Sequence, residues 1–177
     1  MKFLFATALM VGLSGSSVLA LSPEEAAELF EKVRSQMPCL ENAETSAAAY
    51  NLLPTGQGEV GEGYTSFEYG DRSGSSYLVG SYEIGNGRMQ SALSVSVYGA
   101  GDKFGPDLTN AFADLWDLPA PTPLRRNSDA VQFEWQIAFP NADMQVIVMH
   151  VLANDLTQIY GRTLNSSEAQ LRACKSP

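Results

Sequence analysis

Apolar and polar residues alternate along two long stretches of the chain, and this period of two predicts β-strands. In the first stretch the pattern predicts three strands, over residues 64–69, 76–84 and 89–98. In the second it predicts strands over 131–139 and 144–152 and a weaker strand over 157–162. Because alternation turns every second side chain to the same side, we expect a sheet with one apolar and one polar face.

The dipeptide Asn86-Gly87 predicts a tight two-residue hairpin, because both positions of this turn type favour a positive φ. The turn sets the register of the strands on either side, so that Ile84 lies opposite Met89. Every second pair then carries mainly apolar side chains. The opposite face of the same hairpin is rich in serine and carries Tyr77.

A second hairpin is expected between the strands that follow. Closing it with Phe139 opposite Met144 places His150 opposite Phe133, on the same apolar face as Trp135. We therefore expect His150, the only histidine of the chain, to be a buried or half-buried structural residue. Contact with a ligand and acid–base catalysis are the alternatives for this side chain.

Helical spacing of apolar residues predicts the remaining elements. Ser22 and Glu25 form a capping box that starts an N-terminal helix, and a second helical stretch is expected over about residues 40–52. Asp107 is expected to cap a central helix and Asn165 a C-terminal helix. The predicted fold class is α+β: an antiparallel sheet of five to six strands, with N-terminal, central and C-terminal helices packed on its apolar face.

The inferred order of helices and strands is similar to that of type III secretion chaperones and YbjN-like domains. This resemblance implies an α+β fold in which helices accompany an antiparallel meander. It rests on the order of the elements alone, so it implies no activity, cofactor or site residue for this chain.

The first twenty residues have the pattern of an export signal. Lys2 supplies a positive charge, residues 3–13 form an apolar run, and residues 18–20 fit a signal-peptidase site. We expect residues 1–20 to be removed, which leaves residues 21–177 as a single globular domain in the bacterial periplasm or the extracellular space. No later segment approaches the roughly 20 apolar residues of a membrane span, so integral membrane association is not expected.

The charge of the chain is negative and unevenly distributed. The sequence has 20 acidic and 11 basic residues, a net charge of −9, and residues 22–71 contain ten acidic and two basic residues. Phosphate groups are bound by clustered Lys and Arg, so this balance argues against nucleic acid as a partner. Such acidity is typical of a soluble protein; an acidic patch for a basic partner is the alternative.

Cys39 and Cys174 are the only cysteines, and in an oxidising compartment a lone pair usually forms a disulfide. Two free thiols, or a redox or metal role, are the alternatives. No metal site is expected, because neither cysteine has a further Cys or His near it in sequence. No cofactor is expected, because the formal glycine fingerprint at Gly56, Gly58 and Gly61 follows a helix and precedes a strand, the reverse of a dinucleotide-binding unit.

Four residues are candidates for contact with a partner. Tyr77 and Tyr98 lie on the serine-rich face of the first hairpin, where rings supply contact area and hydroxyls supply hydrogen bonds. Arg125 and Arg126 form the only basic pair and suit a carboxylate or a phosphate. The alternative for the tyrosines is an ordinary solvated sheet face, and for the arginines a solvated or internally neutralised pair.

These patterns favour an exported, soluble, non-catalytic domain that binds another macromolecule, such as an envelope protein, a secreted client or an enzyme to be inhibited. No catalytic residue is assigned. One alternative is a carrier of a lipid or other apolar molecule between the sheet and the helices. Its cavity would be lined by residues such as Leu93, Trp116, Trp135 and Val148. The other alternative is a small hydrolase that uses sheet carboxylates such as Glu134, with His150 assisting.

Overall fold

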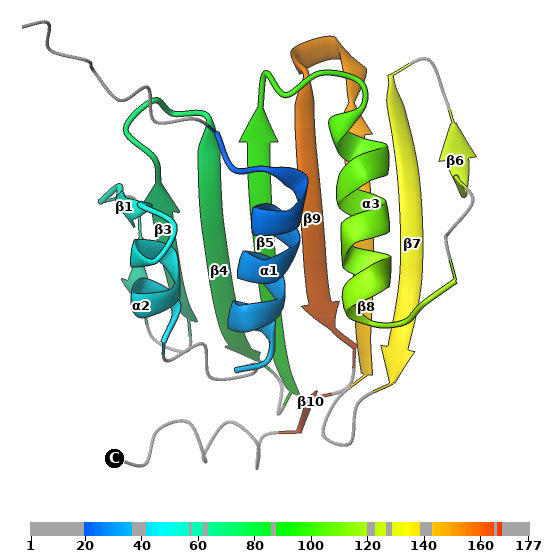
Figure 1. Cartoon of the computed structure of the whole chain (residues 1–177). Helices are drawn as coiled ribbons and strands as arrows, with labels where there is room; N and C mark the ends of the chain where they lie inside the picture. The colour runs from blue at the N-terminus through cyan, green and yellow to red at the C-terminus, as the bar shows by residue number, and fades with distance from the viewer. Residues whose placement is uncertain are drawn as a thin grey trace, which may run out of the picture.

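The computed structural model describes residues 20–36, 42–56, 58–61, 64–85, 88–119, 123–126, 129–138, 143–164 and 166–167. Within these ranges one antiparallel sheet forms the body of the molecule (Figure 1). Its long strands are β3 (Tyr64–Gly70), β4 (Ser76–Gly85), β5 (Arg88–Tyr98), β7 (Ala130–Ala138), β8 (Asp143–Val151) and β9 (Leu156–Thr163). Two-residue strands extend it: β1 (Leu53–Pro54), β2 (Val60–Gly61), β6 (Arg125–Arg126) and β10 (Ser166–Ser167).

Two up-and-down runs of strands lie side by side in this sheet. The strand order is β1-β3-β4-β5-β9-β8-β7-β6, so β9 pairs with β5 at the middle of the sheet and joins the two runs. This pairing brings segments that are far apart in the sequence next to each other: Ala92 of β5 lies opposite Arg162 of β9. The predicted sheet of five to six strands has too few strands, because short strands also join it at its edges and ends.

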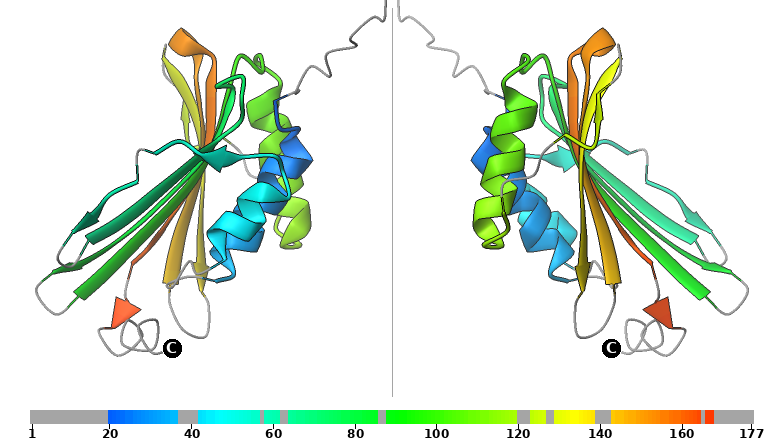
Figure 2. Two further views of the ribbon diagram at one scale, coloured as in Figure 1. Left: turned by 90° about the vertical axis from the view of Figure 1, so that its left-hand side faces the viewer. Right: turned by 90° about the vertical axis from the view of Figure 1, so that its right-hand side faces the viewer.

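All the described α-helices lie on one face of the sheet. They are α1 (Pro23–Arg34), α2 (Ala43–Ala48) and α3 (Phe104–Leu115), and a short 3-10 helix, η1 (Leu152–Asn154), links β8 to β9. α1 and α3 pack against each other and against the sheet beneath them. The side views show the helices on one side of the sheet, and no described element covers the other side (Figure 2).

The hydrophobic core lies between the sheet and the pair α1 and α3. The buried rings of Phe30 and Phe112 meet edge to face, with 5.8 Å between their centroids. Phe112 also contacts Trp135 of β7, at 5.3 Å between centroids. This packing favours a single strand register, because a slip of one residue would turn the apolar side chains of a strand to the uncovered face.

The predicted register of the first hairpin is confirmed. Ile84 pairs with Met89. Four residues further from the turn, Gly80 of β4 lies opposite Leu93 of β5. Leu93 is buried against the helices, as the alternation predicts. Gly80 suits its position because the ring of Phe67 lies directly over it, and a Cβ there would collide with the ring carbon Cζ.

The predicted register of the second hairpin is wrong by two residues. Its innermost pair is Ala138 with Asp143, so His150 lies opposite Val131 rather than Phe133. A shift of two residues leaves every side chain on its predicted face. His150 is therefore still buried, with 3% of its surface exposed.

The predicted capping box at Ser22 and Glu25 is confirmed, with both reciprocal hydrogen bonds present. The central helix begins earlier than predicted. α3 starts at Phe104, and Asp107 lies in its first turn rather than at its N-cap. Pro106 is tolerated in this first turn because a helix has no acceptor there for the N–H that proline lacks.

The predicted C-terminal helix is wrong at its start. Ser166 and Ser167 form strand β10 instead, and they pair with Met89 and Arg88 of β5. Backbone pairing with the end of the sheet therefore prevails over the local capping pattern. The expected cap, Asn165, lies outside the described residues, and so does the chain beyond position 167.

Two further predictions also fall outside the described part of the chain. Cys39 and Cys174 are both outside it, so the disulfide stays a prediction. Residues 1–19, which contain most of the expected export signal, are outside it as well.

Candidate functional site

We call the uncovered side of the sheet the open face. Its side chains come from alternate positions of the long strands. They are Tyr64, Ser66 and Glu68 of β3; Tyr77, Val79 and Ser81 of β4; Ala92, Ser94, Ser96 and Tyr98 of β5; Leu156, Gln158, Tyr160 and Arg162 of β9; Gln145, Ile147 and Met149 of β8; and Gln132, Glu134 and Gln136 of β7. Serine, tyrosine and glutamine supply most of this set, and Glu68, Glu134 and Arg162 are its charged members. The strand register also places Glu83 of β4, Arg88 of β5 and Asp143 of β8 on this face.

Tyr77 and Tyr98 meet at one end of the open face. Their ring centroids are 6.0 Å apart and the ring planes stand at 85°, an edge-to-face arrangement that aromatic pairs prefer. Tyr98 is 41% exposed and Tyr77 is half-buried. On the neighbouring strands Gln158 donates a hydrogen bond from Nε2 to Ser96 Oγ at 3.1 Å. This end of the face therefore combines aromatic area with hydrogen-bonding groups.

Four polar side chains form a hydrogen-bonded chain across the open face from β7 to β9. Gln132 donates from Nε2 to Glu134 Oε2 at 3.3 Å, and Gln145 donates from Nε2 to Glu134 Oε1. Arg162 donates from Nε to Gln145 Oε1 at 2.7 Å. The amide nitrogen and the amide oxygen of Gln145 both form hydrogen bonds, which fixes the orientation of the amide. Gln145 in turn holds the guanidinium of Arg162 in place.

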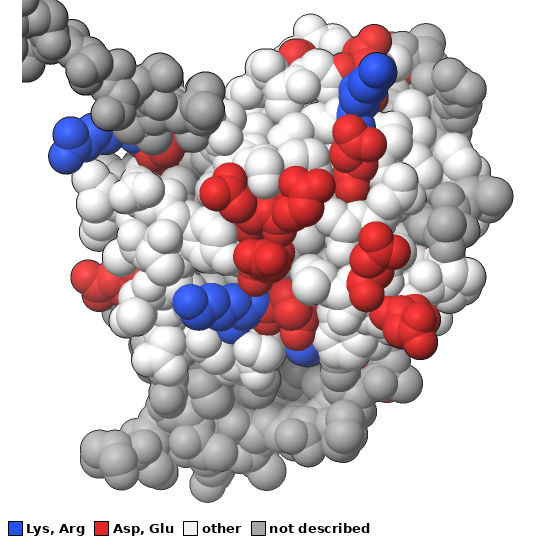
Figure 3. Space-filling model, in the orientation of Figure 1, with Lys and Arg blue, Asp and Glu red and all other residues white. Residues whose placement is uncertain are grey.

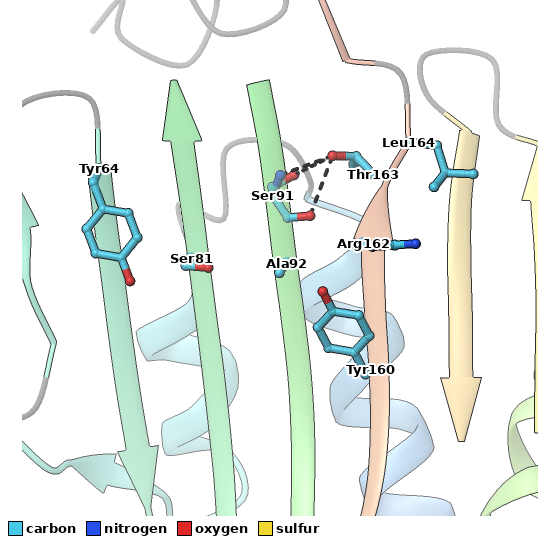
Figure 4. A pocket seen from close by; sticks show the side chains of 8 residues that line it. All are labelled: Tyr64, Ser81, Ser91, Ala92, Tyr160, Arg162, Thr163 and Leu164. Atoms are coloured by element: carbon cyan, nitrogen blue, oxygen red, sulfur yellow. Dashed lines mark hydrogen bonds between the residues drawn. The ribbon is translucent and has the colours of Figure 1, made fainter. Parts of the chain in front are cut away.

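A pocket of about 350 Å³ lies at the Arg162 end of this row of hydrogen-bonded side chains (Figure 4). It is lined by Tyr64, Ser81, Ser91, Ala92, Tyr160, Arg162, Thr163 and Leu164. Figure 4 shows the rings of Tyr64 and Tyr160 on either side of a floor made by Ser81 and Ala92. The volume is within the range of small-molecule sites, which begins near 300 Å³.

The end of this pocket is held by a contact between β5 and β9. The backbone N–H of Ser91 donates to Thr163 Oγ1 at 3.0 Å, and the two hydroxyl oxygens are 3.2 Å apart. Both side chains are buried. The contact fixes the two strands relative to each other, so the floor and one wall of the pocket belong to a rigid part of the sheet.

Arg125 and Arg126 form the edge strand β6. Their backbones pair with Gln132 and Val131 of β7, and their side chains are outside what the structure describes. The structure therefore places this predicted pair at the far edge of the sheet from Tyr77 and does not bring the two candidate groups together.

His150 and Glu134 lie on opposite faces of the sheet. His150 faces the helices, where its Nδ1 is 2.7 Å from Thr157 Oγ1 and its Nε2 is 3.8 Å from Asp102 Oδ1. Glu134 lies on the open face, within the chain of glutamines. The sheet separates the two groups, so this geometry does not bring them to one substrate.

The residues expected to line a carrier cavity lie between the sheet and the helices. Leu93, Val148 and Trp135 are buried in the core. Trp116 is half-buried at the end of α3 and donates from Nε1 to Glu31 Oε2 of α1 at 2.9 Å. These side chains fill the layer between sheet and helices, whereas the pocket lies on the other face of the sheet.

Acidic side chains gather on the helix layer (Figure 3). Exposed carboxylates on α1 and α3 include Glu24, Glu28, Asp107 and Asp114. By strand register the open face carries Glu68, Glu83, Glu134 and Asp143 together with Arg88 and Arg162, so its acidic groups are partly balanced by basic ones. A negatively charged group would meet less repulsion at the open face than at the helices.

Comparison with known proteins assigns no family: the chain matches no family model, no curated protein and no solved structure. Among the helices that the structure describes, none is both long and apolar enough to cross a membrane. Within the described ranges, no group of three or more His, Cys, Asp or Glu side chains is arranged to hold a metal ion.

The pocket is not predictable from the sequence. The weak alternation over 157–162 would have placed Tyr160 and Arg162 on one face, but nothing local shows that β9 lies beside β5. Without that pairing, Ala92 and Arg162 are unrelated positions. The site could not be assembled from sequence because it depends on a contact between distant segments.

Proposed function

We propose that this chain is an exported, non-catalytic binding domain whose open face contacts another protein, in the bacterial periplasm or the extracellular space. The observation that carries the proposal is the one-sided packing of the fold. The helices use one face of the sheet for the core, while the described elements leave a broad face of aromatic, apolar and hydrogen-bonding side chains uncovered.

The composition of the open face supports a protein partner. Tyrosine and methionine are enriched in protein interfaces, and charged residues are depleted at their centres. The middle of the open face has this character, because Val79, Ile147 and Met149 are half-buried there among serines and tyrosines. The edge-to-face pair of half-buried Tyr77 and exposed Tyr98 adds the kind of aromatic anchor that commonly dominates binding energy.

The size of the open face also suits this role. Strand spacing and rise give the six long strands a face of about 700 Å². A standard protein–protein interface buries roughly 800 Å² on each partner. The face is therefore large enough to supply one side of such an interface.

The environment of Leu21 is consistent with removal of an N-terminal signal. Leu21, the first residue expected after cleavage, is buried, and its backbone nitrogen donates to Ser76 Oγ at 3.0 Å. This nitrogen would keep the same bond as the terminal amino group of the mature chain. Export is tested by the mass of the secreted protein, which should correspond to a chain that begins at Leu21.

Site-directed photo-crosslinking in the native host tests protein binding. A photoreactive residue at Val79 on the open face should crosslink one partner, and the same residue at the exposed Asn110 of α3 should not. The purified partner should then bind the double variant Tyr77→Ala, Tyr98→Ala at least tenfold more weakly than wild type. Asp114→Ala, on the exposed side of α3, serves as the matched control.

Two results would contradict this proposal. One is crosslinking from Asn110 but not from Val79, which would place the interface on the helices. The other is unchanged affinity in the double tyrosine variant, provided that its thermal unfolding matches that of wild type.

A further inference from the structure

Among the pocket-lining residues whose side chains the structure describes, Arg162 is the only charged one. Its Nε donates to an amide oxygen, and no acidic side chain of the described part of the chain forms an ion pair with it. This is notable in a protein with 20 acidic and only 11 basic residues. Glu134 is held one step away, because Gln145 stands between it and Arg162. The positive charge of Arg162 is therefore available to a ligand.

The geometry of this arginine suits a carboxylate. Gln145 holds the Nε edge, which leaves the N–H groups of the two terminal nitrogens free to act as a parallel pair of donors. Such a pair matches the two oxygens of a carboxylate. Phosphate esters carry up to two negative charges and are usually met by several basic groups, whereas a single arginine balances a single charge.

Besides the hydroxyls of Ser91 and Thr163, which contact each other, three hydroxyl groups surround the same hollow. Figure 4 shows the hydroxyls of Tyr64 and Tyr160 pointing inward from the two sides, with Ser81 between them. Within the described ranges, none of the three makes a hydrogen bond, so each can act as donor or acceptor to a ligand. The small side chain of Ala92 leaves room above the floor. The hollow thus offers hydrogen-bonding groups around a ligand body, beside a cation.

We infer that this pocket binds a small hydroxylated carboxylate, of the chemical class of the sugar acids. Arg162 receives the carboxylate, and the hydroxyls of Tyr64, Tyr160 and Ser81 receive the hydroxylated body. The site does not depend on the proposed protein partner. Ser81 lies four residues along β4 from Tyr77, a distance of about 13 Å, so the pocket and the tyrosine pair can be tested separately.

Calorimetric titration of the mature protein with three probes tests the ligand class. Glucuronate carries both a carboxylate and hydroxyls, glucose carries hydroxyls alone, and acetate carries a carboxylate alone. Glucuronate should bind at least tenfold more tightly than either of the others, because only it uses the arginine and the hydroxyls together. Equal affinity for glucuronate and glucose would overturn the role of the charge, and equal affinity for acetate would overturn the role of the hydroxylated body.

Substitutions place the site on the protein. Arg162→Gln should lower glucuronate affinity at least tenfold, and Tyr64→Phe and Tyr160→Phe should each lower it about two- to tenfold. Arg72→Gln, at an exposed turn position between β3 and β4, removes the same charge elsewhere and should leave the affinity unchanged. Equal loss in the two arginine variants would overturn the assignment, since it would show a general effect of net charge.

Titration with a peptide distinguishes a free small acid from an acidic side chain of a protein partner as the ligand of Arg162. A short blocked peptide with a central glutamate carries a carboxylate without sugar hydroxyls. It should bind at least tenfold more weakly than glucuronate. Equal binding of the peptide would overturn the small-molecule assignment, while the crosslinking from Val79 would still report on protein binding independently.

Discussion

The ring of Phe30 on α1 lies directly over Gly161 of β9. A Cβ added at Gly161 would fall 2.7 Å from Cζ of this ring and 3.3 Å from Met144 Sδ. Phe30 is fully buried, so its ring has no free space into which to move. The close approach of α1 to the middle of the sheet therefore requires glycine at position 161.

Gly161→Ala should destabilise the fold. The extra methyl group overpacks the core at the contact with Phe30, which typically costs about 1–3 kcal/mol. The free energy of unfolding in urea measures this loss. In a Phe30→Leu background, where the side chain is smaller, the added cost of Gly161→Ala should be smaller. The same cost in both backgrounds would show that the contact with Phe30 does not cause the destabilisation.

Glu31 ties the two core helices together at their ends. Its carboxylate accepts hydrogen bonds from Arg34 Nε and Nη2, both at 2.6 Å, and from Trp116 Nε1 at 2.9 Å. The guanidinium of Arg34 also lies over the indole of Trp116, 4.7 Å from its centroid. The three side chains form one cluster at the junction of α1 and α3.

A double-mutant cycle measures the bond between these helices. Trp116→Phe removes the indole donor, and Glu31→Gln removes the charge of the acceptor while keeping an oxygen. The coupling free energy between the two substitutions should be about 1.5–3 kcal/mol, the usual contribution of a hydrogen bond to a charged group. Strictly additive effects would contradict the energetic link between Glu31 and Trp116.

Reduction should destabilise the mature protein if Cys39 and Cys174 are joined. A bridge over so long a loop restricts the unfolded chain, and its loss typically costs about 2–5 kcal/mol. Unfolding in urea with and without reductant measures the change. The double variant Cys39→Ser, Cys174→Ser should match the reduced wild type and should not respond to reductant. An intact mass that reduction does not raise by two hydrogens would show that no bridge is present.

The parts of the fold that follow from local sequence were predictable. The Asn86-Gly87 turn set the register of the first hairpin through its own backbone preference, and Ser22 with Glu25 placed the start of α1. The second hairpin has no turn of that strength, so its register was wrong by two residues. The face of His150 was nevertheless right, because side-chain orientation repeats every two residues.

The parts that depend on distant contacts were not predictable. Strand β10 replaces the expected start of a C-terminal helix because Ser166 and Ser167 find partners on β5, which no local pattern reveals. The pocket depends in the same way on the pairing of β5 with β9, which brings Ala92 to Arg162. Of the predicted binding residues, Tyr77 and Tyr98 could be placed together because they belong to a single hairpin.

Asp71 makes the stability of the turn between β3 and β4 dependent on pH. Burial alone would raise the pKa of its carboxyl group, but hydrogen bonds from Ser73 and Ser75, with the nearby polar groups of Ser76 and Gly74, outweigh this effect and hold the pKa below its usual value. The contacts include Ser73 Oγ at 2.8 Å and the backbone N–H of Ser75 at 3.0 Å, both to Oδ1. The folded state therefore favours the ionised form of Asp71.

The sign of the effect follows from this lowered pKa. The stabilisation by the carboxylate is fully present above the unfolded-state pKa of about 3.9 and is lost as the pH falls through the lower folded-state pKa. Asp71→Asn keeps an acceptor oxygen for both donors but has no charge to lose. Wild type should therefore exceed Asp71→Asn in unfolding free energy at neutral pH, and the difference should shrink between about pH 5 and pH 2. Ser73→Ala removes one donor and should move this loss of stability to higher pH; a difference between wild type and Asp71→Asn that does not vary with pH would contradict the argument.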